Sequence, residues 1–102
     1  MILRPGMEIR DETLAALCRK HGVLRLEAFG SVLRDDFRPD SDIDLLVEFD
    51  PHAEVGLLAF GALKRALETL LGREVDLVPR GGLKLVIRDE VLRTARTIFR
   101  AA

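Results

Sequence analysis

Apolar and polar residues alternate along three segments of the chain, a pattern typical of strands that bury one side. From Ile43 to Phe49 every odd-numbered residue is apolar, and from Glu74 to Val78 the apolar residues Val75 and Leu77 share one side, with Glu74, Asp76 and Val78 on the other. The segment from Val23 to Phe29 alternates as well, with Leu24, Leu26 and Ala28 on one side and Arg25 and Glu27 on the other. The sequence therefore predicts three strands.

Other segments carry apolar residues at helical spacing, together with residues that commonly begin or end helices. The long central helix presents Leu57, Phe60, Leu63, Leu67 and Leu70 on one face. The predicted helices run from Asp11, as N-cap, to about His21 with Gly22 as the stop; from Ser31, as cap, to about Asp36; from Glu54 to Leu71, closed by Gly72; and from Leu83 to about Arg96.

A short terminal strand from Thr97 to Phe99 would follow the last helix. Helices then alternate with three or four strands, which predicts an α/β (α+β) fold with a short mixed sheet and helices packed mainly on one face. A length of 102 residues suits one domain with one core, spanning 1–102.

Composition narrows the class of protein. The net charge of −1 gives no electrostatic case for nucleic acid as a direct partner. The segment Met1–Arg10 is too short and too charged for a signal peptide, and no apolar run approaches membrane-spanning length, so we expect a cytoplasmic protein with no membrane partner. The single cysteine, Cys18, lies in a helical apolar pattern and is expected in the core.

Three aspartates stand where neighbouring strands would bring them together. Asp42 and Asp44 lie on the polar side at the start of the strand from Ile43, and Asp76 lies on the polar side of the next strand. Neighbouring strands are about 4.8 Å apart, so these carboxylates could share a divalent cation such as Mg²⁺, which in turn binds phosphates. The alternative is that the three acids only decorate a solvated sheet face.

A Gly30-Ser31 turn precedes Asp42 by ten intervening residues. Glycine lets the backbone turn sharply near a ligand, and free amides at a helix start favour anions, so the turn is a candidate phosphate grip. Arg34 could reach a phosphate or be occupied by a neighbouring acid. Ser41 is expected to tie down the loop more than to touch substrate.

These motifs resemble the minimal nucleotidyltransferases (MNT) of the DNA polymerase β-like superfamily. The segments that carry the resemblance are Phe29-Gly30-Ser31, Arg34, Ser41 to Val47 and Val75 to Val78. The resemblance implies that Asp42 and Asp44 bind Mg²⁺ with ATP, that Asp76 binds metal and helps deprotonate the acceptor hydroxyl, and that Gly30 and Ser31 bind the triphosphate. Leu33-Arg34-Asp35 departs from the family's frequent Ala-Arg-Gly and adds a negative charge beside this turn.

Members of this branch are commonly antitoxins of HEPN/MNT toxin–antitoxin systems, and some transfer AMP from ATP to a tyrosine of the HEPN toxin. The resemblance thus implies a Mg²⁺-dependent enzyme of this kind, in a hetero-oligomer with its toxin. The chain contains no tyrosine, so tyrosine self-modification is excluded. Two alternatives stay open: an antitoxin that acts by binding alone, and transfer to an RNA end or a small molecule.

Overall fold

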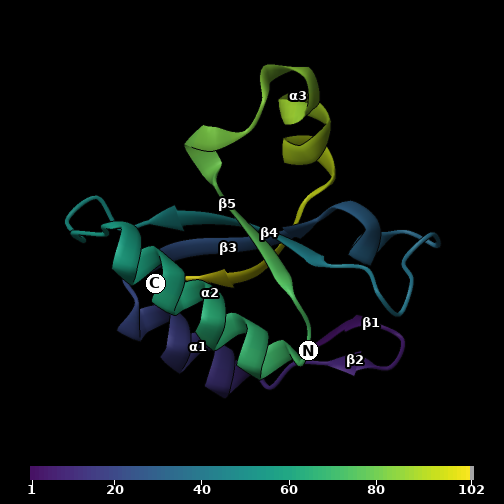
Figure 1. Cartoon of the computed structure of the whole chain (residues 1–102), viewed down its shortest axis with the longest axis horizontal. Helices are drawn as coiled ribbons and strands as arrows, with labels where there is room; N and C mark the ends of the chain where they lie inside the picture. The colour runs from purple at the N-terminus through teal and green to yellow at the C-terminus, as the bar shows by residue number, and fades with distance from the viewer. Residues whose placement is uncertain (102) are drawn as a thin grey trace.

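The computed structural model describes residues 1–101. Six strands, three helices and two single 3-10 turns follow one another along this part of the chain (Figure 1). In chain order they are β1 (Ile2–Arg4), β2 (Met7–Glu8), α1 (Asp11–Lys20), β3 (Val23–Phe29), the turn η1 (Gly30–Leu33), β4 (Ile43–Phe49), α2 (Leu57–Leu71), β5 (Val75–Pro79), the turn η2 (Arg80–Gly82), α3 (Leu85–Thr94) and β6 (Arg96–Arg100).

Four strands form a mixed sheet in the order β5-β4-β3-β6. β3 runs antiparallel to both β4 and β6, whereas β4 and β5 are parallel. Helices α1 and α2 lie on one face of this sheet, and α3 lies across the other (Figure 1). The predicted mixed sheet of up to four strands, with most helices on one face, is therefore confirmed.

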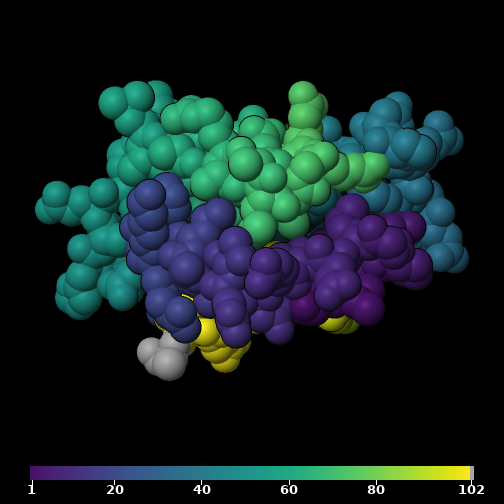
Figure 2. Space-filling view, turned by 90° about the horizontal axis from the view of Figure 1, so that it is seen from below, coloured from purple at the N-terminus to yellow at the C-terminus, as the bar shows by residue number. Residues whose placement is uncertain are grey.

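The main core lies between the sheet and the two helices α1 and α2, which lie side by side in Figure 2. Ile43, Leu45 and Val47 of β4 enter this core, as their alternation predicted. A second, smaller cluster fills the opposite face beneath α3. Its buried members are Phe29, Leu46, Leu83 and Val91.

The first ten residues form an unpredicted element, the hairpin of β1 and β2. Its turn, Pro5-Gly6, is tight, and Leu3 and Ile9 are buried in the main core. The free amine of Met1 donates to Asp11 Oδ1 at 2.9 Å. The hairpin therefore belongs to the folded structure.

Helix boundaries differ from the predicted ones in several places. Asp11 is the first residue of α1, and Arg10 takes the N-cap position. Helix α2 begins at Leu57, three residues later than expected, because Asp50 caps a turn before it through hydrogen bonds to the amides of His52 and Ala53. The last helix is also shorter at both ends, and β6 is longer. In residues 1–101 no helix has both the length and the apolar composition required to cross a membrane.

Candidate active site

The parallel pairing of β4 and β5 sets Asp44 directly beside Asp76. Register partners in neighbouring strands point to the same face, and here that face is the one opposite α1 and α2. Burial, and then the charges of Asp76 and Asp42, raise the pKa of Asp44 above its usual range. The predicted neighbourhood of the acids is therefore present in the fold.

Gly30 lies against Asp44, the central member of the acidic cluster formed by Asp42, Asp44 and Asp76. Its φ of +74° is in the left-handed region that favours glycine, and the adjacent Phe29 is the register partner of Asp44. A Cβ at residue 30 would collide with Asp44 Oδ2 and lie 3.3 Å from Asp44 Cγ. Glycine at this position therefore lets the turn approach the carboxylate more closely than any other residue allows.

The segment after Gly30 is shorter than predicted. The expected helix from Ser31 to about Asp36 is a single 3-10 turn that ends at Leu33, and no side chain caps it. Arg34 adopts an extended conformation, so the helical path ends there. The predicted cap at Ser31 and the predicted helix are thus both wrong. Ser31 is half-buried within the turn, next to Gly30.

Arg34 forms an exposed ion pair with Asp36, with 3.0 Å between Nε and Oδ1. This hydrogen bond lowers the pKa of Asp36. Arg34 also moderates the raised pKa of Asp44, so its charge acts on the acidic cluster. Of the two expectations for this side chain, the surface ion pair is the one the structure contains.

Ser41 and Asp42 join the loop to β4. Ser41 Oγ accepts a hydrogen bond from the Arg38 amide at 3.0 Å, so the serine fastens the loop as expected. Asp42 directly precedes the strand and is exposed. Arg38, earlier in the same loop, is also exposed.

The acids adjoin one another without forming a closed metal site. Within residues 1–101, no three or more His, Cys, Asp or Glu side chains are gathered closely enough to hold a metal ion. The set nevertheless fits Mg²⁺ chemically, because its donors are carboxylate oxygens and the pKa of Asp44 is raised by burial first and then by the negative charges of Asp76 and Asp42, which a cation would relieve. The metal role of Asp42, Asp44 and Asp76 stays a prediction.

A buried ion pair that the sequence did not predict lies on the same face of the sheet as Asp44 and Asp76. Glu27, in the central strand β3, is only 6% exposed. It accepts a hydrogen bond from Arg80 Nη1 of the turn η2, and Arg25 Nε lies 3.7 Å from the same carboxylate. Arg80 is thus engaged in an ion pair with the buried Glu27. A glutamate within an apolar strand was the sequence signal for this pair.

Residues 10–98 match the family described as nucleotidyltransferase domain. Among curated relatives, the protein adenylyltransferase MntA of Thermococcus cleftensis is 43% identical over 77 residues, which cover 76% of each chain. A candidate protein adenylyltransferase of Methanocaldococcus jannaschii is 41% identical over 88 residues, or 86% of this chain and 91% of that protein.

Solved structures are also similar to this chain. A structure described as a minimal nucleotidyltransferase is 48% identical, with a TM-score of 0.69 and coverage of 84% of this chain and 86% of that one. An antitoxin bound to a tri-AMPylated HEPN toxin from Shewanella oneidensis shares the fold, at 22% identity, a TM-score of 0.61, and coverage of 89% and 70%. With its sheet, its paired aspartates and its Gly-Ser turn, the chain belongs to the nucleotidyltransferase domain family.

Proposed function

We propose that this protein transfers AMP from ATP to a tyrosine hydroxyl of a HEPN-type toxin and thereby acts as its antitoxin. The observation that carries the proposal is the contact between Gly30 and Asp44, which places the Gly-Ser turn beside the carboxylate that interacts with Asp76 and Asp42. The relatives named as protein adenylyltransferases support the reaction. A toxin–antitoxin structure with AMP-PNP, 21% identical with a TM-score of 0.69, has the same fold, and this likeness supports nucleotide binding.

In the proposed reaction the acceptor oxygen bonds to the α-phosphorus of ATP while the bond from that phosphorus to the bridging oxygen breaks. Pyrophosphate leaves with the electron pair, and the hydroxyl proton passes to the carboxylate of Asp76. The amides of Gly30 and Ser31 orient the phosphates. Asp42, Asp44 and Asp76 are the residues that would hold Mg²⁺, which supplies charge stabilisation to the transferring phosphoryl group when bound. Arg34 would leave its ion pair with Asp36 and bind a phosphate oxygen of ATP instead.

In this role residues 1–102 would form one minimal nucleotidyltransferase domain that acts in the cytoplasm, where ATP is available. It also requires a hetero-oligomer, since the acceptor tyrosine must come from another chain.

A second candidate function is neutralisation of the partner by contact alone. It is favoured by the apolar side chains that α3 exposes, among them Leu85 at 76% and Val86 at 95%. Exposed apolar surface on a small protein is typical of a protein interface. This surface is compatible with both functions, because an enzyme that modifies a protein must also bind it.

The test is intact-mass spectrometry of a co-expressed HEPN protein. With the wild-type chain we expect a gain of one or more AMP masses, and with Asp42→Ala/Asp44→Ala no gain. Asp40→Ala is the matched control, because Asp40 is an exposed acid two residues from Asp42 and outside the paired strands. Asp76→Asn should reduce transfer more than ATP binding. An unmodified but neutralised toxin would refute the transfer and favour contact alone.

A further inference from the structure

The loop from Arg34 to Ser41 links the two halves of the candidate site, since Gly30 and Ser31 lie just before it and Asp42 directly after it. It contains no helix or strand, and most of its side chains are charged and exposed. The loop also borders a cavity of about 520 Å³, which Arg4, Phe37 and Arg73 help to line. Its one apolar side chain other than proline is Phe37, which is half-buried.

Arg4 of the N-terminal hairpin holds the beginning of this loop. Its Nη1 donates to the carbonyl oxygens of Val32 and Arg34, each at 3.0 Å. Its guanidinium lies over the Phe37 ring, 4.4 Å from the centroid. The hydrogen bonds and the cation–π contact fix this residue to both the turn and the loop.

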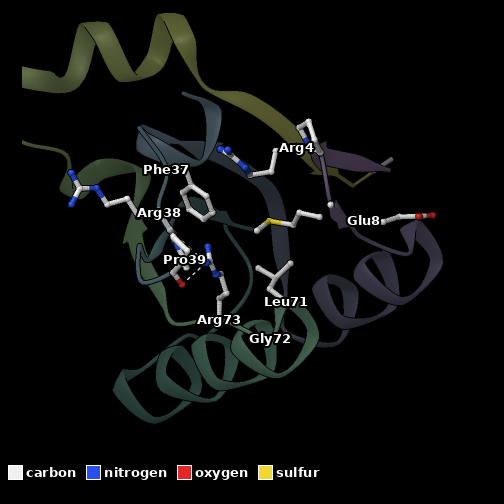
Figure 3. A pocket seen from close by; sticks show the side chains of 11 residues that line it. Arg4, Glu8, Phe37, Arg38, Pro39, Leu71, Gly72 and Arg73 are labelled. Atoms are coloured by element: carbon white, nitrogen blue, oxygen red, sulfur yellow. Dashed lines mark hydrogen bonds between the residues drawn. The ribbon is translucent and has the colours of Figure 1, made fainter. Parts of the chain in front are cut away.

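Arg73 holds the end of the loop from the other side of the same ring. Its guanidinium also lies 4.4 Å from the Phe37 centroid, and its Nη2 donates to the carbonyl oxygens of Arg38 and Pro39. Figure 3 shows Phe37 with Arg4 and Arg73 on its two sides. In the described part of the chain, Arg73 Nη1 is buried without a hydrogen-bond partner. The guanidinium is instead in contact with the face of the Phe37 ring.

Arg73 also connects the loop to the strands that carry the acids. It stands next to Glu74, whose carbonyl oxygen accepts a hydrogen bond from the amide of Ile43 at 2.9 Å, and three residues before Asp76. We propose that Arg4, Phe37 and Arg73 form a clamp that positions the Gly-Ser turn relative to Asp42 and Asp76. They are positioning residues, because none of them belongs to the acidic cluster itself.

The experiment compares Arg73→Gln and Phe37→Leu with a matched control, Arg19→Gln. Arg19 also lies over an aromatic ring, 6.0 Å from the Phe99 centroid, but in α1 and away from the loop. We measure kcat and KM for ATP with the co-expressed toxin at a temperature where every variant is fully folded. The clamp variants should lose tenfold or more in kcat/KM, since a displacement of about 1 Å in a catalytic site can cost about 100-fold. The control and Phe37→Tyr, which keeps the ring, should stay within twofold of wild type.

The kinetic part of this test rests on the proposed function, so hydrogen–deuterium exchange of the nucleotide-free protein is measured in parallel. We expect faster exchange in residues 36–42 of the clamp variants, with unchanged protection in β3 and β4. Faster exchange combined with an inactive wild type would support the clamp and refute the transfer. Unchanged loop exchange, or lowered thermal stability with unchanged kcat/KM, would overturn the clamp.

Discussion

Replacing Gly30 by alanine tests the central feature of the site, the close approach of the turn to Asp44. The substitution has two separate effects. A residue with a Cβ at a φ of +74° carries a backbone strain of about 1–2 kcal/mol, and the unfolded chain loses some entropy, which returns about 0.4–1 kcal/mol. The new Cβ also collides with Asp44 Oδ2, so the carboxylate must move by about 1 Å.

The two effects predict different magnitudes in two assays. The free energy of unfolding, measured by urea titration, should fall by about 1 kcal/mol through the strain. Transfer of AMP should fall by about 100-fold through the displaced carboxylate, equivalent to about 2.7 kcal/mol of transition-state stabilisation. Activity is thus expected to suffer more than stability.

Gly72→Ala is the matched control for this prediction. Gly72 ends α2 in the same left-handed region, with a φ of +68°, and a Cβ there would meet no atom within 4 Å. It should lose similar stability without the loss of transfer. Equal activity in Gly30→Ala and Gly72→Ala would refute the contact between the turn and the acid as a requirement for function.

Three further predictions concern stability and reactivity. Asp44→Asn should stabilise the ligand-free protein at neutral pH, because burial first and neighbouring acids second raise the pKa of Asp44. The stabilising contribution of the Asp44 carboxyl is complete below the ordinary carboxyl pKa, where the group is protonated, and it is lost as pH rises through the raised pKa. The advantage of Asp44→Asn in urea titrations should therefore vanish in acid. Arg80→Ala should lower the free energy of unfolding by about 1–3 kcal/mol, since it leaves the buried Glu27 without its main partner, and equal stability in the same titration would contradict this. Burial raises the pKa of Cys18 to about 12, so a thiol reagent at pH 8 should react only as fast as the protein unfolds; rapid labelling of the native protein would show that this helix is not packed as described.

The parts of the fold that could be predicted are those with a local pattern. β3 and β4 begin and end where their alternation indicated, because each has one side in the main core. The approach of Asp44 to Asp76 followed from a single assumption, that two strands are neighbours. The predicted MNT resemblance is confirmed by the family match over residues 10–98.

The parts that could not be predicted depend on contacts between distant residues. Phe37 is held by side chains that lie 33 positions before and 36 positions after it, and no local pattern records such pairs. The start of α2 was predicted at Glu54, whereas the turn at Asp50 delays it to Leu57, and Leu57 itself is exposed although its spacing put it on the apolar face. A helix was predicted after Gly30, but the segment is a 3-10 turn followed by a loop. Arg4 and Arg73 bind the carbonyl oxygens of this loop, and neither contact can be read from the local sequence.

The two clusters of buried residues have a consequence for how this protein can evolve. Among the described residues, the large buried cluster under α1 and α2 contains none of the three aspartates, Gly30 or Ser31, whereas Asp44 and Asp76 lie on the face that holds the small cluster and the Glu27–Arg80 pair. Substitutions at the exposed positions of α3 can therefore accumulate without eroding the packing of the large cluster. Such a division makes the scaffold mutationally robust.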